Sequence, residues 1–370
     1  SNVSNGSGSS SASGDLDSGQ DKLRDSSSVE NPILSKAISM AGEVFAYPDG
    51  MKYWFEPAFK KACEICDSED IVAVISSSWP ITCHIIAKAI KEKYDIPWIA
   101  DLRDLWNLNP YVSHTAIREH FEKNLEQKTF RNVDVLTVTT DLAAETLATL
   151  HPDKRIVPIL SGYSEEDFRI IDEVLSQNEG ALENNKLKFI YAGSLYSGKR
   201  DPTLLFKGIS ELEEDSRIDS SKIAIEFYGD SGNLLEIAKE YGLSDILTIG
   251  GRVPHKTVLK KEADSDVLLL ISWNNEKEKM FIPGKIYEYF ALKKPVLSIG
   301  YKEGSLKDLI DDTGIGYHVS TLEETKEALL DYYNEFIEKG HLDLNSDLNI
   351  EDYSMETMSS KFAALLDELT

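Results

Sequence analysis

The chain has 370 residues, enough for two domains of ordinary size. Its 41% hydrophobic and 28% charged residues are typical of a globular protein, and its formal net charge of −25 argues against nucleic-acid binding, which needs a basic surface. No apolar run approaches the ~20 residues of a transmembrane helix, no signal peptide is apparent, and the low cysteine content fits a reduced, cytoplasmic protein.

The first half of the chain predicts a disordered tail and then an α/β domain. Residues 1–30 are rich in Ser, Gly and Asp and cannot bury enough apolar surface to fold. Over residues 31–170, strand-like runs alternate with helical periodicity, which indicates a parallel sheet. We expect its strands at 71–78, 97–101, 133–140 and 155–160. No strand with a glycine-rich loop precedes Asn31, so we expect a sheet that lacks its N-terminal unit and exposes an edge. Either the natural protein is longer, or a partner chain or a second copy covers this edge.

A second α/β domain is predicted over residues 186–340. Residues 170–187 are polar and acidic, which predicts a linker. After it, apolar runs such as LKFIYAG and DVLLLISW again alternate with helical segments, which predicts a second doubly wound parallel sheet. The periodic segment 355–370 predicts a C-terminal helix that packs back on the first domain.

The stretch FIPGKIYEYFALKKPVLSIG, residues 281–300, combines a short helix with a buried strand. Apolar residues recur at i, i+3 and i+4 from Ile286, which makes one buried stripe. Pro283 and Gly284 open the helix, because proline is tolerated in a first helical turn. In a doubly wound sheet the positive N-terminal end of such a helix lies at the ligand-binding edge.

Lys285 and Glu288 lie on the polar side of this helix. A lysine beside the helix N-terminus suits a phosphate, and a carboxylate one turn later suits sugar hydroxyls. The alternative is an ordinary i,i+3 ion pair on a solvated face. Spacing alone does not separate these two interpretations.

The loop after the LKFIYAG strand holds Gly193, Gly198, Lys199 and Arg200. Glycines allow a ligand to approach the backbone closely, and adjacent cations suit a diphosphate. The spacing matches neither G-x-G-x-x-G nor G-x-x-x-x-G-K-[ST]. A solvated Lys-Arg pair is the alternative.

Three other segments carry candidate chemistry. Arg252 and Val253, in GGRVPHKT, offer main-chain groups and a flat surface to a base, although a glycine-rich turn is the default. Arg103 and Asp104, in ADLRDLW, follow a strand at the edge where open α/β sheets bind ligands. The segment DSD at 264–266 is like a metal-binding D-x-D motif, but a helix end running into a strand explains it better.

These segments together resemble the GT-B-fold retaining glycosyltransferases, in particular glycosyltransferase family 4. The resemblance spans roughly residues 47–335 and rests on PDGMKYW, IPWIADLRDLW, ILSGYSEEDF, YAGSLYSGKR, FYGDSG, GGRVPHKT, ADSDVLLLIS and PGKIYEYFALKKPVL. It implies two Rossmann-like domains that face a cleft, the second for a sugar nucleotide and the first for the acceptor. The family often has two glutamates separated by seven residues, and Met280 occupies the first position here.

The resemblance also implies roles for the candidate residues. Glu288 matches the glutamate that holds the donor ribose, and Lys199, helped by Arg200, matches the lysine that stabilises the leaving diphosphate. Arg252 and Val253 match the base-binding segment, and Gly193 matches the donor-side loop. Pro283, Gly284 and Lys285 match the helix start over the phosphates. Arg103 and Asp104 match the acceptor-side cleft.

The sequence therefore predicts a glycosyltransferase that uses a nucleotide-diphosphate sugar and a glycan or lipid-linked acceptor, with no cofactor and no metal. A lipid-linked acceptor implies peripheral contact with the inner membrane face. A nucleotide-sugar epimerase of the same fold is one alternative. A non-catalytic nucleotide-binding subunit, whose partner supplies the missing part of the first domain, is the other.

Overall fold

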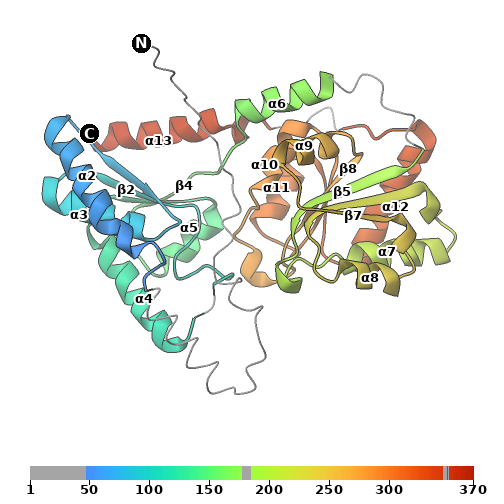
Figure 1. Cartoon of the computed structure of the whole chain (residues 1–370), viewed down its shortest axis with the longest axis horizontal. Coiled ribbons are helices and arrows are strands. Elements are labelled where there is room, and N and C mark those ends of the chain that lie inside the picture. The colour runs from blue at the N-terminus through green and yellow to red at the C-terminus, as the bar shows by residue number, and fades with distance from the viewer. Residues whose placement is uncertain (1–46, 113, 177–184, 345–347, 349) are drawn as a thin grey trace, which may run out of the picture. The chain divides into compact units, whose positions relative to one another are not determined.

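The computed structural model of the chain describes residues 47–112, 114–176, 185–344, 348 and 350–370 (Figure 1). The predicted tail at 1–30 and the segment around Asn31 lie outside the described residues. In the described part, the strands form two parallel sheets with helices between consecutive strands, so the predicted α/β class with two Rossmann-like sheets is confirmed.

The first sheet has the strand order β1-β2-β3-β4 within the described ranges, and all its pairs are parallel. Its elements are, in chain order, α2 (Phe55–Ser68), β1 (Val74–Ser77), α3 (Thr82–Tyr94), β2 (Trp98–Leu102), α4 (Ala116–Thr129), β3 (Val135–Val138), α5 (Asp141–Ala148) and β4 (Ile156–Pro158). The strands lie where the apolar runs predict them. Among the described residues β1 pairs on one side only, with β2, and its Ile75 is 46% exposed.

Helix α13 (Met355–Leu369) covers one face of this sheet. Successive residues of β2 point to opposite faces, as the two-residue period of a strand requires. Trp98 and Ala100 join the core beneath α3 and α5, whereas Ile99 packs with Leu365 of α13. The C-terminal helix is therefore part of the core of the first sheet.

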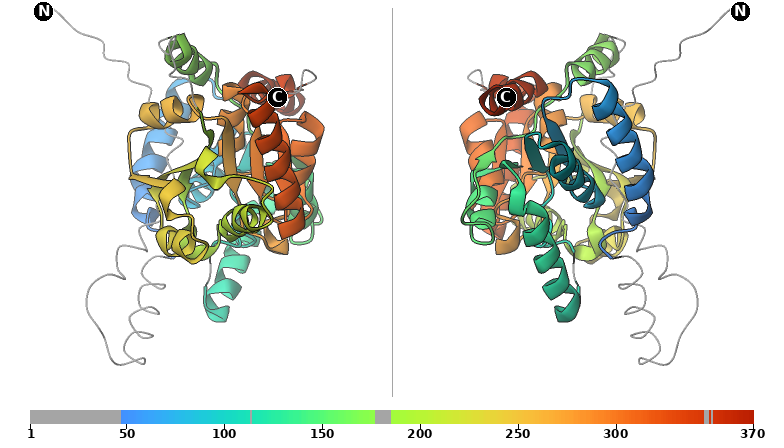
Figure 2. Two further views of the ribbon diagram at one scale, coloured as in Figure 1. Left: turned by 90° about the vertical axis from the view of Figure 1, so that its right-hand side faces the viewer. Right: turned by 90° about the vertical axis from the view of Figure 1, so that its left-hand side faces the viewer.

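The second sheet has the order β10-β9-β8-β5-β6-β7 within the described residues. Its elements are β5 (Leu187–Ser194), α7 (Thr203–Glu214), β6 (Ile223–Asp230), α8 (Leu234–Glu240), β7 (Leu247–Gly251), α9 (His255–Ala263), β8 (Val267–Ile271), α10 (Lys285–Leu292), β9 (Val296–Ile299), α11 (Ser305–Thr313), β10 (Gly316–Val319) and α12 (Leu322–Lys339). One face packs against α7, α8 and α12 and the other against α9, α10 and α11, with helices visible on both sides in Figure 2.

The strand order reverses between β5 and β8, because β6 and β7 lie on one side of β5 while β8, β9 and β10 lie on the other. Ligands of doubly wound sheets bind outside the carboxyl ends of the strands at such a switch point. The loops after β5 and β8 meet there, and the structure joins them by an isolated bridge between Arg200 and Trp273. This edge is therefore the candidate ligand site of the second sheet.

Two helices differ from the expectations drawn from composition. The acidic character of 170–187 predicts a linker, but α6 (Glu165–Ser176) occupies its first part. Ile171 is 1% exposed and joins the apolar cluster under α9 and α10, and this burial stabilises the helix. No helix was predicted at α11. Its residues Leu306, Leu309 and Ile310 are buried against the second sheet. None of the described helices is long and apolar enough to cross a membrane.

Candidate functional site

Helix α10 begins at the carboxyl edge of the second sheet with Gly284 as its N-cap and Lys285 as its first residue. The apolar stripe places Ile286, Tyr289 and Phe290 at 0% exposure, as its spacing predicts. Lys285 and Glu288 keep side-chain exposures of 24% and 17%. The two candidate residues therefore lie on the accessible side of the first helical turn, near the positive end of the helix dipole.

A cluster of charged residues from α9 and α10 surrounds the Lys285 ammonium. Lys285 Nζ lies 3.5 Å from Oε1 of Glu262 and 3.9 Å from Oε2 of Glu288, and His255 Nε2 lies 3.5 Å from the same Glu288 oxygen. Burial raises the pKa of Glu288, but the nearby His255 and Lys285 outweigh it and lower the pKa overall. Glu288 is thus an ionised carboxylate, and its buried Oε2 accepts no hydrogen bond from the described residues.

The loop after β5 places Lys199 among aromatic rings. Its Nζ lies 4.8 Å from the ring centroid of Tyr111 and 4.8 Å from that of Trp273, and it donates to the Pro110 carbonyl oxygen over 3.3 Å. Cation–π contacts of this length hold an ammonium without neutralising it. Lys199 therefore keeps its positive charge for an anionic ligand.

Arg200 lies beside Lys199 and connects the loop to β5. Its Nη1 donates to the Tyr191 hydroxyl over 3.4 Å, its Cζ lies 4.3 Å from the Tyr196 ring centroid, and its buried Nε has no partner among the described residues. Burial lowers the pKa of Lys285, and the charges of Glu262 and Glu288 raise it further than burial lowers it. Arg200, after β5, and Lys285, at the start of the helix after β8, both lie at the carboxyl edge of the second sheet, where β5 and β8 are neighbours.

Glu278 and Tyr111 are part of this cluster, although no sequence motif pointed to them. Tyr111, in the loop after β2, donates its hydroxyl to Glu278 Oε1 over 2.6 Å. Glu278 is 6% exposed, and its Oε2 has no partner in the described ranges. Burial raises the pKa of Glu278, while the Tyr111 hydrogen bond and the charges of Arg200 and Lys199 act against that rise. The partners are 167 positions apart, so a local pattern could not have identified them.

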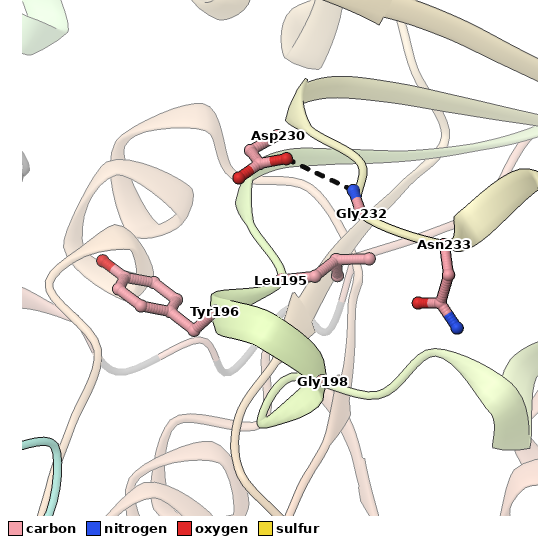
Figure 3. A pocket seen from close by; sticks show the side chains of 6 residues that line it. All are labelled: Leu195, Tyr196, Gly198, Asp230, Gly232 and Asn233. Carbon is pink, nitrogen blue, oxygen red and sulfur yellow. Dashed lines mark hydrogen bonds between the residues drawn. The ribbon is translucent and has the colours of Figure 1, made fainter. Parts of the chain in front are cut away.

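A pocket of about 280 Å³ opens beside this loop, between the ends of β5 and β6 (Figure 3). Its lining residues are Leu195, Tyr196, Gly198, Asp230, Gly232 and Asn233. Ligand pockets usually measure about 300–1,000 Å³, so this one would hold only part of a nucleotide sugar. Gly193 is just before the loop, where β5 and β6 come very close: a Cβ on Gly229, its register partner, would lie 2.2 Å from the Gly193 carbonyl oxygen.

Arg252 and Val253 lie just after β7. Arg252 is exposed, and Val253 packs against the apolar cluster that includes α9 and α10. His255 begins α9 two residues later and reaches Glu288. The structure thus connects the GGRVPHKT turn to the start of α10. Pro283 is half-buried and Gly284 is exposed at the same start.

Arg103 and Asp104 lie at the carboxyl end of β2 in the first sheet. Arg103 Nε donates to both carboxylate oxygens of Asp101 over 3.0 and 2.9 Å, and Nη1 donates to the Ile159 carbonyl oxygen over 2.9 Å. Nη2 has no partner among the described residues. Asp104 is exposed, and its main-chain carbonyl accepts from the Ser78 hydroxyl over 2.8 Å. Most of the Arg103 guanidinium therefore organises the edge, and one buried nitrogen is left without a hydrogen bond among the described residues.

The DSD segment lies where α9 ends and the chain runs into β8. Asp264 is the C-cap of α9, and Asp266 Oδ2 accepts from the backbone N–H of Lys188 over 2.8 Å. No group of three or more His, Cys, Asp or Glu residues suited to a metal ion occurs in the described part of the chain. The interpretation of DSD as a helix end is confirmed.

The sequence matches no protein-family model and no curated protein. Solved structures do match. A glycosyltransferase from Rickettsia africae superimposes with a TM-score of 0.61 at 14% identity, over 93% of this chain and 83% of that one. Anabaena HepE in complex with UDP superimposes with a TM-score of 0.59 at 13% sequence identity, over 85% of this chain and 82% of that one. A UDP-GlcNAc 2-epimerase from Methanocaldococcus jannaschii superimposes with a TM-score of 0.50 at 14% sequence identity, over 85% of this chain and 82% of that one. At these identities the likeness shows the fold, which is that of the GT-B glycosyltransferases.

Proposed function

We propose that this chain is a glycosyltransferase that moves a sugar, with retention, from a nucleotide-diphosphate sugar to a glycan or lipid-linked acceptor, as in glycosyltransferase family 4. The observation that supports it best is the set of charges at the switch point of the second sheet. Two adjacent cations, Lys199 and Arg200, converge there with the N-terminus of α10, which carries Lys285 and the ionised Glu288.

Each part of a donor has a chemical counterpart along this edge. The diphosphate suits Lys199, Arg200 and the positive end of α10, which carry the charge that it needs. A ribose offers neighbouring hydroxyl donors, and Glu288 offers a carboxylate oxygen that makes ion pairs but accepts no hydrogen bond from the described residues. Arg252 and Val253, on the turn that leads to His255, are assigned to the base.

The proposed reaction relies on positioning and charge. The bond between the anomeric carbon and the diphosphate oxygen breaks, and the acceptor hydroxyl oxygen forms a bond to that carbon. The hydroxyl proton passes to the leaving phosphate, which stays on the same face of the sugar. Lys199 and Arg200 neutralise the charge that develops on the diphosphate, so this mechanism uses no metal ion. Arg103 and Asp104 are assigned to the acceptor side, through the exposed carboxylate of Asp104 and the Nη2 of Arg103, a buried nitrogen without a hydrogen-bond partner among the described residues.

Product analysis with UDP- and GDP-sugars tests this proposal. A thermal-shift panel first selects the donor, because a ligand at 100 times its Kd adds about 2.7 kcal/mol of stability. The donor is then incubated with and without glycan and lipid-linked acceptors. Transfer that requires an acceptor supports the proposal. Conversion of the donor alone would identify an epimerase, and binding without turnover would identify a nucleotide-binding subunit.

A further inference from the structure

Glu262 is a carboxylate that the second domain buries without hydrogen bonds. It lies in the last turn of α9 at 0% exposure, and neither Oε1 nor Oε2 has a hydrogen-bond partner in the described ranges. Its ion-pair partner is Lys285, whose Nζ lies 3.5 Å from Oε1. Burying an ionised carboxylate so poorly partnered costs several kcal/mol. A buried polar group in this state needs a physical explanation.

The charges that face Glu262 do not balance when every carboxylate is ionised. Lys285 is shared between Glu262 and Glu288, so one cation faces two anions. His255, at the start of α9, is 52% exposed and faces Glu288. Tyr289 also faces Glu262, but its hydroxyl donates to a carbonyl of β8 over 2.9 Å. A diphosphate that approached Lys285 would therefore meet a site whose positive charge is already taken.

A proton on Glu262 removes this conflict. Burial raises the pKa of Glu262 to about 7, although the charge of Lys285 opposes the rise, while the pKa of Glu288 is lowered. Of the two carboxylates that share Lys285, Glu262 is thus the one that is protonated near neutral pH. Its protonated form leaves Lys285 paired with Glu288 alone.

We propose that Glu262 positions Lys285 and takes up one proton from solvent when the diphosphate of a nucleotide sugar binds at the start of α10. This inference rests on the proposed function. The negative charge of the diphosphate disfavours the ionised form of the buried Glu262 carboxylate. The protein with ionised Glu262 therefore binds the ligand together with one proton, and Glu262 is neutral in the complex. The Lys285 ammonium then faces one carboxylate, Glu288, in place of two, so it has positive charge left for the diphosphate, and Glu288 stays ionised for the donor hydroxyls.

Calorimetric titration of the full chain measures this proton directly. The probes are UDP-glucose, UDP-N-acetylglucosamine and GDP-mannose, because a substituted diphosphate has no terminal phosphate that titrates near pH 6. Each is titrated at about pH 7.5 in two buffers of different ionisation enthalpy. We expect net uptake of a substantial fraction of a proton, and a Kd that rises by up to about tenfold per pH unit above pH 7.

Two variants distinguish proton uptake by Glu262 from proton uptake by the neighbouring His255. Glu262→Gln should abolish the proton uptake and flatten the pH profile of the Kd, whereas His255→Gln should keep both. Wild-type binding without proton uptake overturns the inference and leaves the proposed function intact. Failure of every nucleotide sugar to bind at any pH overturns both. If Glu262→Gln does not fold, the His255→Gln protein decides: uptake that persists supports the inference, and uptake that disappears contradicts it.

Discussion

Two clusters of charged residues, one in each sheet region, contain the same residue types but partner their carboxylates differently. In the first, Arg118, Glu122, Glu126 and His151 lie between 0% and 8% exposed. In the second, Lys285, Glu262, Glu288 and His255 gather at α10. Each set holds two glutamates, a cation and a histidine. They differ in the hydrogen bonds that the carboxylates accept.

Every carboxylate oxygen in the first cluster is satisfied. Glu122 accepts from Arg118 Nε over 2.6 Å and from Trp106 Nε1 over 2.8 Å. Glu126 accepts from the Asn107 backbone N–H over 3.1 Å and pairs with His151 Nε2 at 3.1 Å. In the second cluster, both oxygens of Glu262 and one of Glu288 accept nothing from the described residues. The first cluster holds the loop after β2 in place by hydrogen bonds, whereas ion pairs with Lys285 and His255 hold the carboxylates of the second.

The largest expected contrast is in stability. Glu122→Ala removes the carboxylate to which Arg118 and Trp106 donate, and should lower the free energy of unfolding by about 3–5 kcal/mol. Glu262→Ala breaks no hydrogen bond among the described residues, and removal of a buried, poorly partnered carboxyl group offsets the packing loss, so a change within about 1 kcal/mol is expected. Urea unfolding of both variants at pH 7 measures the difference. Equal losses of unfolding free energy in the two variants would show that the two clusters stabilise the fold to the same extent.

Lys199→Ala probes the charges at the switch point. Loss of one preorganised donor should lower kcat by about 10²–10³, and affinity for a nucleoside diphosphate should fall more than affinity for the nucleoside. Lys326→Ala is the matched control, because Lys326 pairs with Glu211 and Asp215 on the surface. An equal loss for diphosphate and nucleoside would mean that Lys199 does not contact phosphate.

Glu262 should also make stability depend on pH. Its folded pKa of about 7 lies above the ordinary 4.5, so its neutral form favours folding below pH 4.5 and that contribution is lost as the pH rises towards and beyond 7. Glu262→Gln does not titrate. Its stability relative to wild type should therefore increase by roughly 3 kcal/mol from pH 4.5 to 8. Parallel pH profiles for the two proteins would refute the raised pKa.

Glu288→Gln tests the second cluster with a smaller expected change in free energy. The amide keeps the shape but loses charge-assisted hydrogen bonds to a ribose, each worth about 1.5–3 kcal/mol. Nucleotide binding should weaken by that amount while the unfolding midpoint changes little. Glu173→Gln, on the exposed side of α6, is the control. Unchanged affinity in Glu288→Gln would remove the ribose role.

Local patterns predicted the fold better than the site. Apolar alternation and the stripe from Ile286 identified the strands and α10, because burial follows a short period in sequence. The helix at α6 was missed because its acidic face hides the contact of Ile171. Glu262, in the charged run LKKEAD, is buried only because tertiary packing covers it, and Glu278 gains its role from Tyr111, far away in sequence. Such contacts have no local signal.

A crystal structure with the tightest-binding nucleotide sugar tests the central claim most directly. The account predicts diphosphate oxygens within about 2.7–3.2 Å of Lys199 or Arg200 and of the first residues of α10, with a ribose hydroxyl on Glu288. A diphosphate bound away from the carboxyl edge of the second sheet, or a donor that touches neither Lys199, Arg200 nor Glu288, would contradict it.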